Sequence, residues 1–145
     1  MSLHKALFLT ATDTTIGFLS QDSVRLDWVK KRPSHMPYIR VYPSLAAFKT
    51  RRRFPRRWHN KLRRSRLTSY IHPCGESFRL VRNPRHLLLL QRLGWAYSTS
   101  ANLSSVPYDE SYARSVADIV IEPLGSPGDP SRIFKLGKRK LRKRR

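Results

Sequence analysis

Residues 98–104 form a run of small, hydroxyl-rich side chains, Ser-Thr-Ser-Ala-Asn-Leu-Ser, directly after the apolar segment 95–97. Such side chains are short hydrogen-bond donors and acceptors, so they can approach a phosphate or a carboxylate closely. In an open α/β sheet, ligands collect at the carboxyl ends of the strands. The run therefore predicts either an anion-binding loop after a strand or a Ser- and Asn-rich turn that caps a helix near Ser104.

Three earlier segments also place polar side chains next to apolar runs. They are 11–18 (Ala-Thr-Asp-Thr-Thr-Ile-Gly-Phe), 30–37 (Lys-Lys-Arg-Pro-Ser-His-Met-Pro) and 77–81 (Ser-Phe-Arg-Leu-Val). Together with 98–104, these segments in this order resemble the YrdC-like family of threonylcarbamoyl-AMP synthases, whose motifs read PTETVYGLG, KxRP, AVRxPxHP and TSANLSG. The resemblance spans roughly residues 5–133, and 30–33 and 98–104 are its most specific parts.

The resemblance implies a nucleotidyltransferase that joins L-threonine, bicarbonate and ATP into threonylcarbamoyl-adenylate. The carbamate carboxylate of the carbamoylated threonine attacks the α-phosphate, and pyrophosphate leaves. Other threonylcarbamoyl-transfer proteins then pass the group to an adenosine beside the tRNA anticodon. This chemistry needs positioning and neutralised phosphate charge, with Mg²⁺ on the ATP, and no protein nucleophile. No Ser-His-Asp or Cys-His nucleophile is evident in the sequence.

By position, the resemblance also implies two sets of ligand-contacting residues. The set expected to bind ATP is Lys30, Arg32, Ser100 and Asn102, with Ser98 as support. The set expected to bind threonine is Thr14, Arg79 and Ser131, where the arginine would hold the carboxylate in a bidentate contact. The same residue types allow simpler interpretations. Lys30 and Arg32 could be positive charges at a helix C-terminus, and Arg79 could be a cross-strand partner of Glu76.

The sequence departs from the family's motifs at seven positions: Ala11, Asp13, Ile16, Met36, Val41, Val81 and Ser105. These differences keep a second interpretation open, a basic YrdC-like protein that binds double-stranded RNA or tRNA without full catalytic activity. A carbamoyl-transfer protein that acts on another acceptor is a third interpretation.

The formal net charge of the chain is +21, and the excess is concentrated in two segments. Residues 49–66 hold ten Lys or Arg and no acid, and residues 132–145 hold nine more, again with no acid. Dense cationic side chains attract phosphate backbones. The predicted RNA-binding residues are Arg51, Arg52, Arg53, Arg56, Arg57, Lys61, Arg63, Arg64, Lys138, Arg139 and Lys140. The alternative is a solvated basic face and a disordered tail.

The composition indicates one folded domain. The 145 residues are 39% apolar and 10% aromatic, enough for one core and too few for two domains. No stretch approaches the ~20 apolar residues of a membrane span, and the N-terminus does not resemble a signal peptide. A single cysteine, Cys74, fits a reducing cytoplasm, and the histidines show no metal-ligand spacing. We expect a domain over 1–134, with 49–66 as a basic insertion, and a basic, disordered tail over 135–145.

Strand and helix patterns alternate along the chain, so we expect an α/β fold with a single twisted mixed sheet flanked by helices. The resemblance adds a concave central groove. The clearest helices are 84–93, which ends at Gly94, and 23–30, with Val24, Trp28 and Val29 facing inward. Strands are expected at 6–9, 38–42, 67–71, 77–81, 95–98 and 118–121, with 133–134 as a possible edge. Within 50–65, the four-residue spacing of Phe54, Trp58 and Leu62 favours a helix that packs these three side chains.

Overall fold

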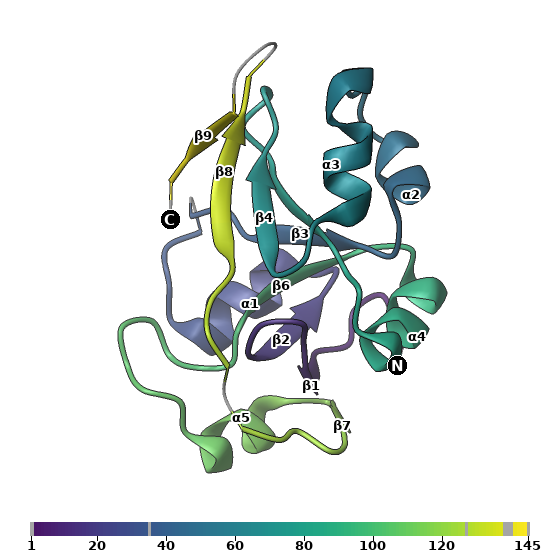
Figure 1. Ribbon diagram of the computed structural model, residues 1–145. Helices are drawn as coiled ribbons and strands as arrows, with labels where there is room; N and C mark the ends of the chain where they lie inside the picture. The colour runs from purple at the N-terminus through teal and green to yellow at the C-terminus, as the bar shows by residue number, and fades with distance from the viewer. Residues whose placement is uncertain (1, 35, 127, 138–140, 145) are drawn as a thin grey trace.

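The computed structural model describes residues 2–34, 36–126, 128–137 and 141–144, and over these residues the chain forms one mixed sheet flanked by helices (Figure 1). Nine strands lie in the order β7-β1-β2-β6-β3-β5-β4-β8-β9. In chain order they are β1 (Phe8–Ala11), β2 (Ile16–Ser20), β3 (Ile39–Tyr42), β4 (Thr68–Ile71), β5 (Ser77–Leu80), β6 (Ala96–Ser100), β7 (Ile119–Ile121), β8 (Arg132–Leu136) and β9 (Leu141–Lys143). The predicted α/β class with a single mixed sheet is confirmed.

The helices are α1 (Ser23–Lys30), α2 (Leu45–Lys49), α3 (His59–Arg64), α4 (Pro84–Leu93) and α5 (Glu110–Val116), with a short 3₁₀ turn η1 (Arg56–Trp58) before α3. In Figure 1, α2 and α3 lie side by side at one end of the molecule, near the β8–β9 hairpin. The helix α5 and the strand β7 lie at the opposite end. The basic insertion and the C-terminal strands therefore occupy the same end of the molecule.

The strand β1 is covered on both faces, which explains the unbroken apolar run that leads into it. Leu7 and Leu9 belong to a core that includes residues of α1 and α5, whereas Ala6 and Phe8 belong to a second core with residues of α4. This is the two-residue alternation of a strand between two helical layers. A third core packs residues of α2 and α3 against β3, β4, β5 and β8.

The helix α4 has the predicted bounds and clear end signals. The side chain of Asn83 accepts hydrogen bonds from the backbone amides of Arg85 (3.0 Å) and His86 (3.2 Å), which caps the first turn. Pro84 occupies the first turn, where no intrahelical amide bond is lost, and Gly94 ends the helix with a φ of 83°.

The helix α1 has the predicted bounds, but only part of its predicted inward face is buried. Leu26 and Val29 are fully buried, whereas Val24 is 73% and Trp28 is 70% exposed. Residues three apart lie on one helix face, so packing Leu26 and Val29 inward turns the pair Val24 and Trp28 toward solvent. The predicted burial of Val29 is confirmed, whereas the inward orientation predicted for Val24 and Trp28 was wrong.

The basic insertion is anchored by the three side chains that its spacing singled out. Leu62, on α3, is fully buried in the third core, and Phe54 and Trp58 pack against that core. The indole Nε1 of Trp58 also donates a hydrogen bond to the carbonyl of Gly137 at 3.1 Å. The helix is shorter than expected because it begins only after Pro55 and the 3₁₀ turn.

The C-terminal segment differs from the expected disordered tail. The strand β8 runs to Leu136, past the expected domain end at 134, and β9 pairs with it antiparallel. Leu136 is 1% exposed, and Leu141, its partner in register, packs against the third core. These two leucines provide the apolar contacts that make a hairpin from an otherwise cationic segment. The expected edge strand at 133–134 therefore lies inside the sheet, with β9 outside it.

Within the described residues, no helix combines the length and the apolar character needed to cross a bilayer.

Leu62 should be a main support of the basic insertion. We expect Leu62→Ala to lower the free energy of unfolding by about 2–5 kcal/mol, because it leaves a cavity in a closed core. Leu88→Ala, at a position on α4 that is 66% exposed, should change it by less than about 0.5 kcal/mol. Urea unfolding monitored by circular dichroism measures both values. Similar losses in the two variants would contradict the burial of α3 against the third core.

Candidate functional site

A cavity of about 270 Å³ lies where the turn after β1, the start of β3, the end of β6 and the start of β8 converge. Five of the predicted ligand-contacting residues line it: Thr14, Arg32, Arg79, Ser100 and Ser131. Ser98, expected as support, also lines it. The sheet order separates β2 from β8 by several strands, so a shared cavity requires a strongly curved sheet. The cavity corresponds to the expected concave groove.

Hydroxyl groups build the turn that carries Thr14. The Oγ1 of Thr12 accepts from the amide of Thr15 (3.2 Å) and donates to the carbonyl of Thr15 (2.6 Å), which closes the turn. Gly17 follows, and a Cβ there would lie 2.9 Å from the carbonyl oxygen of Thr99, so β2 and β6 approach each other closely. Gly128 packs against the carbonyl oxygen of Thr14. The turn is thus held from both sides, with Thr14 at the cavity.

Asp13 connects this turn to the start of α4. Its carboxylate accepts the backbone amides of Arg82 and Asn83, each at 2.7 Å. These bonds satisfy two backbone amides just before the helix, and each oxygen of the carboxylate accepts one of them. Asp13 therefore positions the turn.

Arg79, on β5, is a buried arginine at the cavity. It is 4% exposed, and its Nε has no hydrogen-bond partner among the described residues. Burial lowers its pKa, which the negative charge of Asp13 partly opposes. Glu76, the partner considered from the sequence, instead pairs with Arg40 and Arg52, so that interpretation is wrong. A buried guanidinium without an acid favours binding an anion.

His86 lies near Arg79 and was not identified from the sequence as a site residue. It is 1% exposed, and neither ring nitrogen has a hydrogen-bond partner among the described residues. Burial, opposed by the charge of Asp13 and assisted by that of Arg79, lowers the pKa of His86 to about 4. The imidazole is therefore neutral at pH 7. The signal in the sequence was weak, because a single histidine within an apolar helix is usually a core residue.

Lys30 and Asn102 lie behind the cavity rather than in its lining. The ammonium of Lys30, 3% exposed, donates to the carbonyl oxygens of Ser100 (2.8 Å) and Asn102 (2.7 Å). Burial and the nearby Arg32 lower its pKa to about 8. The amide nitrogen of Asn102 donates to the carbonyls of Leu103 (2.8 Å) and Val106 (2.7 Å). Both side chains hold the 100–106 loop in place, which differs from the direct phosphate contact expected of Lys30.

Arg32 and Ser131 occupy two further walls of the cavity. The guanidinium of Arg32 lies 4.4 Å from the ring centroid of Tyr38 and donates to the carbonyl of Pro37 at 2.8 Å. Ser131 is buried at 3% exposure, and its hydroxyl lies 2.7 Å from that of Ser69 on β4. Stacking fixes the plane of the arginine, while the two hydroxyls join β4 to the start of β8.

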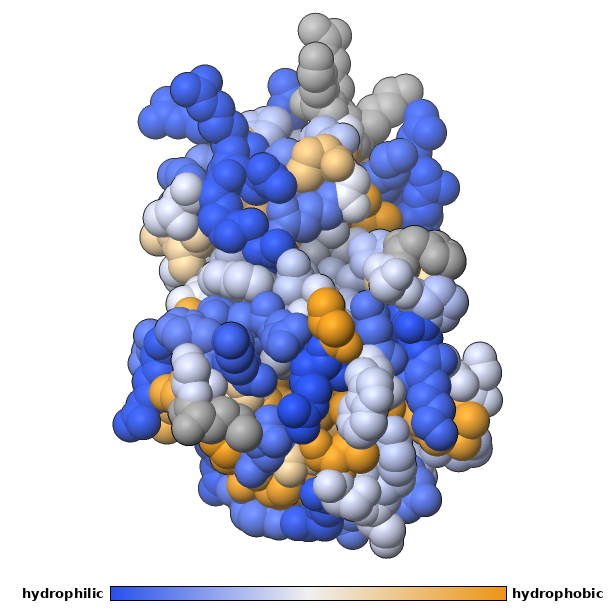
Figure 2. Space-filling model, turned by 180° about the vertical axis from the view of Figure 1, so that it is seen from behind, coloured by the Kyte–Doolittle hydropathy of each residue, from blue (hydrophilic) through white to orange (hydrophobic). Residues whose placement is uncertain are grey.

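The predicted RNA-binding arginines and lysines of 51–64 are exposed and surround α3. Three of them have partners: Arg52 pairs with Glu76 at 3.0 Å, Arg51 lies 5.5 Å from the ring centroid of Trp95, and Lys61 lies 5.9 Å from that of Phe134. Figure 2 shows hydrophilic side chains over the end of the molecule that carries α2, α3 and the β8–β9 hairpin. Lys138, Arg139 and Lys140 lie outside the described residues. Within the described part of the chain, no cluster of three metal-binding side chains occurs.

Comparison with known proteins identifies the fold. No family model and no curated protein matches the chain. The solved structure of E. coli YciO is similar to this chain, with a TM-score of 0.77 and 14% sequence identity. The match covers 97% of this chain and 82% of YciO. The chain has the YrdC-like fold.

Two further structures show the same YrdC-like fold. P. abyssi Sua5 complexed with L-threonine matches 94% of this chain with a TM-score of 0.76 and 16% identity. Full-length HypF in a phosphate- and nucleotide-bound form matches 97% with a TM-score of 0.73 and 16% identity. The chain spans about half the length of the Sua5 structure (48%) and a quarter of HypF (26%).

The buried His86 should make the protein sensitive to acid. Its pKa is about 4 in the folded state and about 6.5 when unfolded, so between these values the unfolded chain binds more protons. Stability should therefore fall as the pH drops from 6.5 to 4, by up to about 3 kcal/mol from this group. The variant His86→Leu should lose that part of the pH dependence.

Urea unfolding at several pH values, compared between the natural chain and His86→Leu, measures this contribution. The comparison also cancels the titration of the carboxylates, which both proteins share. Parallel stability curves between pH 6.5 and 4 would contradict a neutral, buried His86.

Proposed function

We propose that the chain forms threonylcarbamoyl-adenylate from L-threonine, bicarbonate and ATP. The observation that carries this proposal is the buried guanidinium of Arg79 beside a cavity lined by hydroxyl groups, with no acidic partner among the described residues. Such a group favours a ligand with a carboxylate, because a buried charge without a counter-ion is costly. The likeness to a Sua5 structure that holds L-threonine supports the choice of amino acid.

In the proposed arrangement the chain acts by positioning its substrates. Arg79 binds the threonine carboxylate, and the hydroxyls of Thr14 and Ser131 lie within the same cavity for the threonine side chain. ATP then lies toward Arg32 and Ser100, with Lys30 and Asn102 holding the loop that carries Ser100. Mg²⁺ accompanies ATP on its phosphate oxygens.

The reaction is balanced without a protein nucleophile. The threonine amine adds to bicarbonate with loss of water and becomes a carbamate. A carbamate oxygen attacks the α-phosphorus of ATP, and pyrophosphate leaves. In this proposal Arg32, which lines the cavity, offsets the phosphate charge. The adenylate would then be used by other threonylcarbamoyl-transfer proteins on a tRNA. The expected cytoplasmic location fits this use.

Arg79→Gln should weaken threonine binding by about 30-fold, equivalent to ~2 kcal/mol, because glutamine cannot form the charge-assisted bidentate hydrogen bonds of a guanidinium. The same change should not lower the melting temperature without ligand, since it removes an unpaired buried charge. Arg85→Gln, an exposed arginine at the start of α4, should change neither quantity. Threonine-dependent pyrophosphate release and thermal stabilisation by threonine and Mg-ATP measure these effects.

A folded protein that releases no pyrophosphate at saturating substrates would contradict the proposed reaction. Equal loss of threonine use in Arg79→Gln and Arg85→Gln would contradict the assigned role of Arg79.

The second candidate function is RNA binding without full catalysis, which the exposed cations around α3 favour. Residues 49–66 contain no acid, and Arg56, Arg57, Arg63 and Arg64 are exposed to solvent. Phosphate contacts of this kind position an RNA without specifying its sequence. This function uses a different part of the surface from the cavity at Arg79.

Replacing Arg56, Arg57, Arg63 and Arg64 with Gln should flatten the salt dependence of RNA affinity. On a single strand the slope of log K against log salt should fall by roughly 0.7 for each phosphate that the variant no longer neutralises. The control, Arg85→Gln with Arg92→Gln on α4, should keep most of the slope. Fluorescence anisotropy over a salt series measures the slopes. An unchanged slope in the fourfold variant would mean that these arginines are merely solvated.

A further inference from the structure

A second cavity, of about 330 Å³, lies on the other side of the central strands. Side chains alternate along a strand, so Arg40 points away from Ile39, which lines the first cavity. Arg40 lies opposite Tyr97 in the β3–β6 register, and both line the second cavity. Pro37 and Tyr38 line both cavities and therefore separate them.

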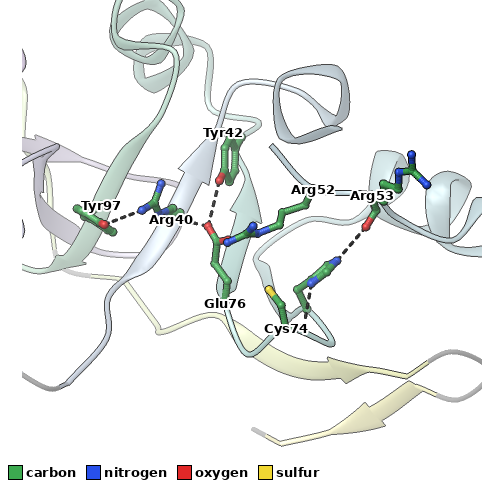
Figure 3. A network of polar contacts seen from close by, with 8 residues as sticks. Arg40, Tyr42, Arg52, Arg53, Cys74, Glu76 and Tyr97 are labelled. Atoms are coloured by element: carbon green, nitrogen blue, oxygen red, sulfur yellow. Dashed lines mark hydrogen bonds and ion pairs between the residues drawn. The ribbon is translucent and has the colours of Figure 1, made fainter. Parts of the chain in front are cut away.

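The second cavity is lined by a cation that lies over two adjoining aromatic rings, whose planes meet at 85°. The guanidinium carbon of Arg40 lies 4.2 Å from the ring centroid of Trp95 and 4.7 Å from that of Tyr97. Arg40 also donates to the Tyr97 hydroxyl at 2.7 Å and pairs with Glu76 at 3.2 Å (Figure 3). Its Nη1 has no hydrogen-bond partner among the described residues. The guanidinium is thus held rigidly by its rings, the Tyr97 hydroxyl and Glu76.

The carboxylate of Glu76 already has three partners within the protein. Glu76 accepts from the hydroxyl of Tyr42 at 3.1 Å and pairs with both Arg40 and Arg52 (Figure 3). Two arginines share this one acid, and the exposed Arg51 and Arg53 adjoin Arg52 in the chain. Asp27, the other acid in the lining, accepts a hydrogen bond from the hydroxyl of Tyr38 at 2.6 Å. The excess positive charge next to the aromatic rings therefore lies on the side of Arg51 and Arg52.

We propose that this cavity binds an unpaired nucleotide of a single-stranded RNA. The base lies against Tyr97, and the phosphates on either side of it lie against Arg51, Arg52 and Arg53. Unpaired bases bind proteins by stacking on aromatic rings and guanidinium planes, while cations follow the backbone. A base inside a duplex is stacked on both sides and cannot enter such a cavity. The proposal goes beyond adenylate formation and rests on the second candidate function.

Met36, 44% exposed, lines this cavity and offers a test that spares the core. Met36→Glu should weaken binding of a single strand of about 12 nucleotides by about tenfold, through repulsion of the RNA and weaker base stacking. Binding of a duplex of the same sequence should weaken by no more than about threefold. Met36→Gln, similar in size and uncharged, should bind the single strand nearly as well as the natural chain. Leu88→Glu, an equally charged change on α4, should leave both RNAs unaffected.

Anisotropy titrations at one fixed salt concentration, with 2-aminopurine in the single strand, provide the readout. Quenching of 2-aminopurine that Met36→Glu abolishes supports a stacked base. Equal affinity for single strand and duplex in the natural chain, or equal weakening of both by Met36→Glu, would overturn the proposal. No binding of either RNA would overturn it together with the RNA-binding candidate. Pyrophosphate release in the same preparations reports on the first cavity separately.

Discussion

The hydrogen bonds from the backbone amides of Arg82 and Asn83 to the carboxylate of Asp13 hold the candidate site together. They join the threonine-rich turn after β1 to the segment between β5 and α4, far apart in the sequence. The same bonds occupy the acid nearest to Arg79, whose guanidinium is left without an ion pair in the described structure. Were this carboxylate to pair with Arg79 instead, the cavity would contain a neutralised pair and have little attraction for an anion.

The central strands carry two arginines on opposite faces, one with an acidic partner and one without such a partner among the described residues. Arg79, on the face toward α4, is 4% exposed and lacks an acidic partner among the described residues. Arg40, on the other face, lies over two adjoining rings and is paired with Glu76. A buried ion pair contributes little net stability, but an unpaired buried charge costs several kcal/mol. The fold tolerates Arg79 without a counter-ion, which is expected of a binding site and unexpected of a structural residue.

The alternation of strands and helices was predictable because local signals define it. Asn83, Pro84 and Gly94 specify the ends of α4, and the bounds of α1 were also correct. The strand β2 was not predicted, because the glycine within Ile16–Ser20 interrupts the strand pattern, and its pairing with β1 and β6 is what makes it a strand. The orientation of α1 and the hairpin of β8 and β9 likewise depend on tertiary contacts of Leu26, Leu136 and Leu141, which no local pattern reveals.

The candidate site shows the same limit at the level of single side chains. The motif order correctly brought Thr14, Arg79, Ser100 and Ser131 to one cavity. The motif order did not reveal the direction in which each side chain points. That direction decides whether a residue lines the cavity or supports a neighbouring loop. The ammonium of Lys30 donates hydrogen bonds to the carbonyl oxygens of Ser100 and Asn102. The segments 30–33 and 100–102 are therefore connected directly, and moving one displaces the other.

A substitution of Lys30 would therefore disturb the loop even if no phosphate ever met its ammonium. Loss of activity in such a variant could not distinguish a ligand contact from a displaced loop. Arg32 and Ser100, which line the cavity, are the positions of these two segments where a substitution reports on the ligand itself.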